Sequence, residues 1–123
     1  MNTKLTMVLR IVLGLIFLIF GADKFLNFLS LPAFEGPAGE FMGAIMATGY
    51  LFSLIAITEI VAGVLLILNK WKGFAMLLAS VMIVNILAFH LALDPGGLGL
   101  VAVMLGIILL LYFKNWYKFK YLF

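Results

Sequence analysis

Residues Ile57–Leu68 read ITEIVAGVLLIL, an apolar run with one carboxylate, Glu59, near its start. Between Met42 and Lys70 no other residue is charged. A charged side chain at the centre of a membrane-spanning helix costs about 2.5–3.5 kcal/mol on insertion scales, so such residues usually face the protein interior. The stretch therefore predicts a membrane helix that turns Glu59 away from lipid and toward a partner.

The whole chain has the composition of a membrane protein. Its 123 residues are 67% hydrophobic and 11% charged, against about 45–50% and 25% in soluble domains. Helices satisfy their own backbone hydrogen bonds in lipid, and glycines, prolines and charges separate four apolar runs. We expect an all-α, integral membrane four-helix bundle in a single domain, with helices at about 5–22, 41–68, 73–93 and 98–113.

The basic residues predict the orientation. Four crossings place both termini and the loop at about 69–72 on one side, which collects most of the cations: Lys4, Lys70, Lys72, Lys114, Lys118 and Lys120. The positive-inside rule then predicts cytoplasmic termini and a multi-pass protein of the cell inner membrane. The tail YFKNWYKFKYLF also alternates aromatic and basic residues. Directly after a membrane helix, it is expected to anchor at the anionic lipid surface and to bind no nucleic acid.

Small residues recur at helical spacing and predict which face of each helix points inward. The predicted faces are Arg10, Gly14, Phe17 and Gly21; Ala56, Glu59, Ala62 and Gly63; Asn85, Ala88 and Ala92; and Gly99, Ala102 and Gly106.

Depth then selects a buried polar cluster. At about 1.5 Å per residue from the cytoplasmic lysines, Arg10 lies about 9 Å deep, Glu59 about 16 Å and Asn85 about 20 Å. With the long Arg10 side chain reaching toward Glu59, these three residues are expected to meet. The cluster has two interpretations: an ion pair that only fixes helix register, or a functional site.

A second polar group is predicted at the opposite end of the bundle. His90 and the adjacent residues Asp23 and Lys24 fall at similar depths, about 27 Å from the basic side. The simpler alternative is an ordinary helix-end ion pair beside an interfacial histidine.

Cysteine and histidine counts exclude several redox sites. The chain has no Cys and one His, which excludes a disulfide relay, a thiolate metal site, cysteine-ligated iron–sulfur clusters and a bis-histidine haem. No metal site and no covalently bound cofactor are expected. A redox cofactor of this chain is then diffusible or belongs to a partner.

Three segments resemble the DoxX-like family of small four-helix membrane proteins: RIVLGLIFLIFGADKF from Arg10, TEIVAGVLLIL from Thr58, and NILAFH, which ends at His90. The resemblance covers about residues 8 to 93. It implies a four-helix bundle linked to membrane redox functions, similar to the membrane subunits of thiosulfate:quinone oxidoreductases.

On this resemblance we expect an accessory subunit of a quinone-linked redox complex, without catalytic machinery of its own. The quinone would be diffusible and held by Asp23, Lys24 and His90, with an aromatic cover from Phe25, Phe28 and Phe34. A proton- or cation-coupled transporter that uses Glu59 is the alternative. A purely structural assembly subunit is the third possibility, and both a redox-protein partner and a homo-oligomer stay open.

Overall fold

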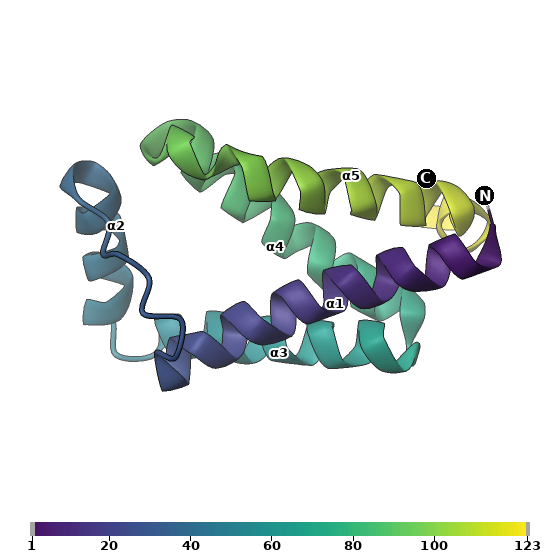
Figure 1. Ribbon diagram of the computed structural model, residues 1–123, viewed down its shortest axis with the longest axis horizontal. Coiled ribbons are helices and arrows are strands. Elements are labelled where there is room, and N and C mark those ends of the chain that lie inside the picture. The colour runs from purple at the N-terminus through teal and green to yellow at the C-terminus, as the bar shows by residue number, and fades with distance from the viewer. Residues whose placement is uncertain (1, 123) are drawn as a thin grey trace.

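The computed structural model describes residues 2–122 and is helical, with no strand in that range (Figure 1). Four helices are long: α1, α3, α4 and α5. The elements are α1 (Thr3–Leu26), α2 (Gly36–Ala47), α3 (Leu51–Leu68), α4 (Lys72–Leu93), the 3₁₀ turn η1 (Pro95–Gly97), α5 (Leu98–Lys114), α6 (Trp116–Phe119) and the 3₁₀ turn η2 (Lys120–Leu122).

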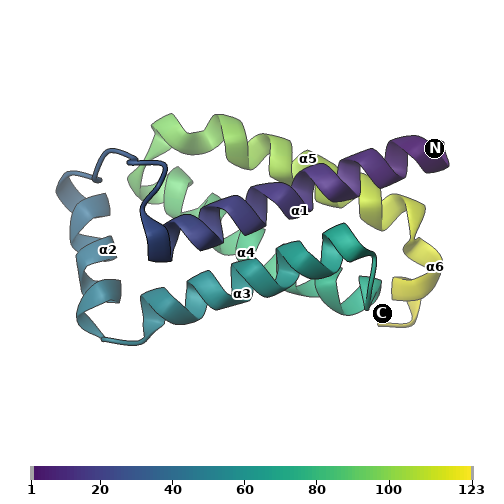
Figure 2. The same cartoon turned by 60° about the horizontal axis from the view of Figure 1, so that its bottom comes forward.

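The four long helices run back and forth along one axis and form a bundle (Figures 1 and 2). In length and apolar composition each can cross a membrane, with η1 extending the fourth span to Pro95–Lys114. Both termini and the α3–α4 loop lie at one end, which we call the terminus end, and α2 crosses the other, the α2 end. The all-α four-helix membrane fold is confirmed, whereas the cytoplasmic placement of the termini stays a prediction.

The helix expected over about 41–68 is two helices, α2 and α3, with a corner between them. The Thr48 hydroxyl donates to Ile45 O (2.7 Å) and accepts from Leu51 N–H (3.0 Å), so it ends one helix and caps the next. Gly49 has a φ of +81°, a conformation that favours glycine. The absence of a charged residue between positions 42 and 58 concealed this corner, and α2 lies across the bundle end instead of extending the span (Figure 2).

Helices α1 and α3 approach each other closely through glycines. A Cβ on Gly63 would meet Gly14 O at 2.6 Å, and a Cβ on Gly21 would meet Ala56 O at 3.0 Å. The predicted inward faces of these two helices are confirmed, because Arg10, Gly14, Phe17, Gly21, Ala56, Glu59, Ala62 and Gly63 are all buried. Close backbone contact replaces bulky side-chain packing along this pair.

The inward faces predicted for the last two long helices are wrong. None of the predicted residues lies in the core, and all six are exposed: Asn85, Ala88 and Ala92 of α4, and Gly99, Ala102 and Gly106 of α5. Larger side chains form the core instead: Met76, Ile83, Met104, Ile107, Ile108 and Leu111. Lipid is as apolar as the protein interior, so a small residue on a membrane helix does not by itself indicate the buried face.

The C-terminal tail folds back over the terminus end. The short helix α6 turns across the bundle (Figure 2), and Phe119 is buried against Tyr112, with ring centroids 4.6 Å apart. Tyr117 stays exposed, as an interfacial residue would. The tail expected only as a surface anchor is thus also part of the core.

Candidate functional site

Glu59 forms an ion pair with Lys24. The Lys24 ammonium lies 2.8 Å from the Glu59 carboxylate, and the Glu59 side chain is only 4% exposed, against 22% for Lys24. Lys24 is in the last turn of α1, and Glu59 is on the buried face of α3. The carboxylate in the apolar run is therefore neutralised by a residue from the neighbouring helix.

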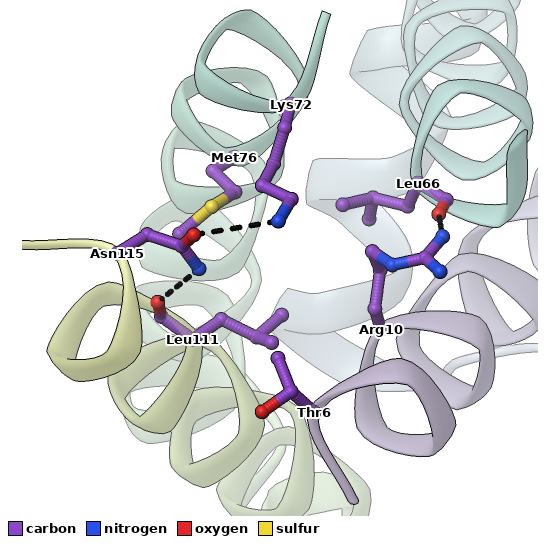
Figure 3. Close-up of a pocket in the computed structure, with 7 residues that line it drawn as sticks. All are labelled: Thr6, Arg10, Leu66, Lys72, Met76, Leu111 and Asn115. Carbon is purple, nitrogen blue, oxygen red and sulfur yellow. Dashed lines mark hydrogen bonds between the residues drawn. The ribbon is translucent and has the colours of Figure 1, made fainter. Parts of the chain in front are cut away.

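The expected pair of Arg10 with Glu59 is wrong. Arg10 donates to the carbonyl oxygens of Leu66 and of Ile67, the latter at 3.1 Å, at the C-terminal end of α3 (Figure 3). Both carbonyls lie in the last turn of α3, where helical i+4 donors run out. Leu66 O also accepts from Asn69 N–H (3.3 Å), and the guanidinium supplies a further donor.

Helix geometry explains this change of partner. Gly14 contacts Gly63 in the antiparallel pair, so Arg10, four residues before Gly14, faces Ile67, four residues after Gly63. Side chains on a helix lean toward its N-terminus. Arg10 therefore leans away from Glu59, whereas Lys24, further along α1, leans toward it.

Asn85 completes the correction of the predicted cluster. Its side-chain amide donates to Val81 O within α4 (2.8 Å), and the residue is exposed, outside the protein core. Arg10, Glu59 and Asn85 do not form one buried group, because Arg10 lies at the terminus end. Glu59 and Asn85 nevertheless line the same cavity.

The outer group of Asp23, Lys24 and His90 is also divided among other partners. Asp23 accepts a hydrogen bond from Leu29 N–H (2.7 Å) and thereby holds the chain after α1. His90 Nδ1 lies 3.0 Å from the carboxylate of Asp94 and 3.1 Å from its carbonyl oxygen. The residue that orients the imidazole is thus Asp94, four residues along the same chain, and its i, i+4 spacing was the sequence signal that could have identified it.

Lys24 and His90 do share a cavity of about 710 Å³ at the α2 end. Its lining comes from the halves of α1, α3, α4 and α5 that are nearest α2, together with α2 and the preceding loop. The polar members are Lys24, Glu59, Asn85 and His90. Apolar side chains form the rest of the wall, among them Phe17, Phe20, Phe52, Ile55, Ile86, Leu100, Val101 and Met104.

An aromatic group stands beside His90 in this wall. The Phe89 ring packs against His90 and Phe34 with centroids 5.1 Å apart in each case, and against Phe41 at 5.6 Å. Of the three phenylalanines predicted to cover a ligand, Phe34 lines the cavity, whereas Phe25 and Phe28 are exposed and do not. Phe41 was not foreseen because α2 was read as part of a membrane span.

Gly97 gives the imidazole its space. A Cβ at this position would overlap the His90 ring, so the turn after α4 needs a residue without a side chain there.

Within residues 2–122, no three His, Asp or Glu side chains lie close enough together to hold a metal ion. The cavity can therefore offer an apolar volume, an ammonium, a carboxylate and an imidazole, all from this chain.

The comparison with known families gives one match. A family model described as DoxX matches residues 5–91, which include α1 to α3 and most of α4. No match was found among the curated proteins or among the solved structures. The matched range carries most of the cavity wall, including all four of its polar residues.

Proposed function

Because the chain belongs to the DoxX family of membrane proteins, we propose that it binds a lipid quinone in the cavity and acts as an accessory subunit of a membrane redox complex. The observation that carries the proposal is the shape and chemistry of that cavity. Ligand pockets typically enclose about 300–1,000 Å³, with apolar walls and a few polar groups that fix orientation. The cavity of about 710 Å³ has this character.

The two ends of a quinone have different requirements, and the lining supplies both. The isoprenoid tail needs an apolar wall, which side chains such as Ile55, Ile86 and Met104 provide. The ring oxygens need donors, and an ammonium has three N–H groups, so Lys24 can donate to a ligand as well as to Glu59. Phe89, beside His90, offers an aromatic surface for the ring.

His90 is the residue in this wall suited to proton transfer. Its Nδ1 faces two acceptor oxygens of Asp94, which favours a proton on Nδ1. In the neutral imidazole Nε2 is then an acceptor, and it becomes a donor when the ring is protonated. Nε2 of His90 would thus accept a proton from a ligand hydroxyl when the ring is neutral and donate one when the ring is protonated, while the redox-protein partner would take or supply the electrons.

A matched pair on α3 tests the cavity. Ile55 lines it, whereas Ile57, two residues along, is exposed outside it. We expect Ile55→Phe to weaken binding of a short-tailed quinone about ten-fold or more, since the added ring occupies the ligand's volume, and Ile57→Phe to bind like the parent. Binding is measured on purified, folded protein in detergent by isothermal titration calorimetry. Equal affinity in both variants would contradict the proposal.

A second comparison tests which polar residues contribute to quinone binding. His90→Gln should weaken quinone binding, whereas Asp23→Asn should not, because Asp23 is outside the cavity and asparagine keeps an oxygen that can accept from Leu29 N–H. Purification in mild detergent should also recover the proposed redox-protein partner. Loss of binding in both Asp23→Asn and His90→Gln would favour the triad predicted from the sequence, and unchanged binding in His90→Gln would contradict a role for the histidine.

A proton- or cation-coupled transporter is the second candidate, supported by the position of Glu59 in the cavity wall. A transported cation would have to displace the Lys24 ammonium, which already lies 2.8 Å from the carboxylate. Proteoliposomes that contain this protein alone test it. Proton-coupled flux that disappears in Glu59→Gln would support transport and count against a purely accessory role.

A further inference from the structure

The charged side chains at the terminus end are basic, and the acidic side chains lie elsewhere. The five acidic residues of the chain all belong to the α2 end or to the cavity: Asp23, Glu35, Glu40, Glu59 and Asp94. The basic residues of the α3–α4 loop and of the tail lie at the opposite end (Figure 1). Acid and base are thus separated along the length of the bundle.

Two cations of the terminus end, Lys72 and Arg10, line one small pocket (Figure 3). Lys72, the first residue of α4, extends its ammonium toward the buried Asn115, with Nζ 3.4 Å from Asn115 Oδ1. Arg10 approaches from α1 on the other side, and its guanidinium turns to the carbonyls of α3. The lining is Thr6, Arg10, Leu66, Lys72, Met76, Leu111 and Asn115, and it leaves no room for a water molecule. The pocket therefore holds the two cations in place, and a ligand would lie over it.

The positive charges of Lys118, Arg10 and Lys114 act on the Lys72 ammonium and disfavour its charge. Lys118 belongs to α6, which is held against the bundle by the buried side chain of Phe119. The folded tail thus keeps Lys118 at the same end of the bundle as Lys72.

The ordinary alternative is a basic surface that faces only water and mobile counterions. Two features argue against it: Arg10 is nine-tenths buried, and Lys72 is half-buried with its head directed to Asn115. Protein oxygens hold both cations, which fixes two positive charges at this end of the bundle. The exposed rings of Trp71 and Tyr117 stand at the same end, where aromatic side chains mark the level of lipid headgroups.

From this arrangement we infer that the terminus end is a binding site for the phosphate group of an anionic lipid, held by Lys72 and Lys118 and supported electrostatically by Arg10. A phosphodiester offers oxygen acceptors to both ammonium groups and offsets the repulsion between them. The site is separate from the quinone cavity, which lies at the α2 end, so each proposal can fail without the other.

The test compares two lysines of the same end. Lys72→Gln removes a charge from the site while keeping an N–H that can donate to Asn115. Lys70→Gln removes one charge two residues away, from an exposed residue outside the pocket. Native mass spectrometry of each purified protein, titrated with phosphatidylglycerol and in parallel with phosphatidylcholine, measures the affinity for each lipid.

The parent should bind phosphatidylglycerol more tightly than phosphatidylcholine. Lys72→Gln should weaken phosphatidylglycerol binding about five-fold and Lys70→Gln less than two-fold, since one cation near a lipid surface contributes on the order of 1 kcal/mol. Lys118→Gln, at an exposed position, should weaken it as Lys72→Gln does and serves where Lys72→Gln is poorly folded. Equal losses in the Lys70 and Lys72 variants, or no preference for the anionic lipid, would overturn the site.

Competition with inorganic phosphate distinguishes a lipid headgroup from a free phosphate compound as the ligand. If the lipid is the ligand, millimolar phosphate should not displace phosphatidylglycerol. Displacement by phosphate in the parent, lost in Lys72→Gln, would overturn the lipid and assign the site to a free phosphate compound.

Discussion

At the scale of single residues, the pair of Lys24 and Glu59 is the most consequential contact. Removing one member of a buried ion pair leaves the other charge uncompensated, which costs roughly 3–5 kcal/mol. Because Lys24 is 22% exposed, we expect Lys24→Ala to destabilise the protein by about 3 kcal/mol, the lower end of that range. The measurement is the thermal unfolding temperature in detergent. An unfolding temperature equal to the parent's would show that the pair contributes nothing.

Double-mutant cycles distinguish this pair from the one first expected. Lys24→Met and Glu59→Leu should be strongly non-additive, because the double variant leaves no unpaired charge in the apolar wall. Arg10→Met and Glu59→Leu should be additive within about 0.5 kcal/mol, because Arg10 bonds to Leu66 and Ile67 and shares no partner with Glu59. Strong coupling between Arg10 and Glu59 would restore the original pairing.

Helices are the next scale, and here the glycine contact between α1 and α3 can be tested. Gly63→Ala would place a Cβ 2.6 Å from Gly14 O and 2.8 Å from Leu18 N, both backbone atoms that cannot move aside easily. We expect a loss of about 1–3 kcal/mol in the free energy of unfolding. Gly106→Ala on α5 is the control, since no atom of the bundle lies within 4 Å of its added Cβ. A Gly63→Ala protein as stable as Gly106→Ala would refute the close packing.

Prediction of the buried helix faces from the sequence succeeded for the two helices that carry a charged residue within their apolar run. Small residues at helical spacing, on the same faces as Arg10 and Glu59, indicated the buried faces of α1 and α3, and these two charges cannot face lipid without cost. It failed where lipid removes the distinction between small and large apolar residues, as with Ala88 and Gly106.

The site depended on details that residue spacing does not carry. The partner of Glu59 followed from the direction in which helical side chains lean, and the role of α2 from a corner at Thr48 and Gly49. Depth estimates placed Lys24 and His90 at one end, and both do line the cavity. They could not assign Asp23 to Leu29 and Asp94 to His90, since those hydrogen bonds depend on local loop geometry.

For the molecule as a whole, the untested feature is its orientation. The basic terminus end should face the cytoplasm. In intact cells, a cysteine at Asn69, in the α3–α4 loop, should then be protected from a membrane-impermeant thiol reagent, and one at Gly96 should react. Gly96 is preferred to Gly97 because a side chain at Gly97 would displace His90. The parent has no Cys, so labelling reports only the introduced residue. Reversed labelling would invert the topology.

The position of the cavity in one half of the bundle determines how a ligand is supplied. Its walls come from the α2-end halves of the four long helices, together with α2 and the preceding loop, so a lipid-soluble occupant would come from the adjacent bilayer leaflet. Its chemical potential is set by its mole fraction among the lipids there and not by its concentration in water. Half-saturation should therefore shift in proportion when more lipid or detergent is added at a fixed total amount of quinone. A protein of this design would respond to the composition of one face of its membrane.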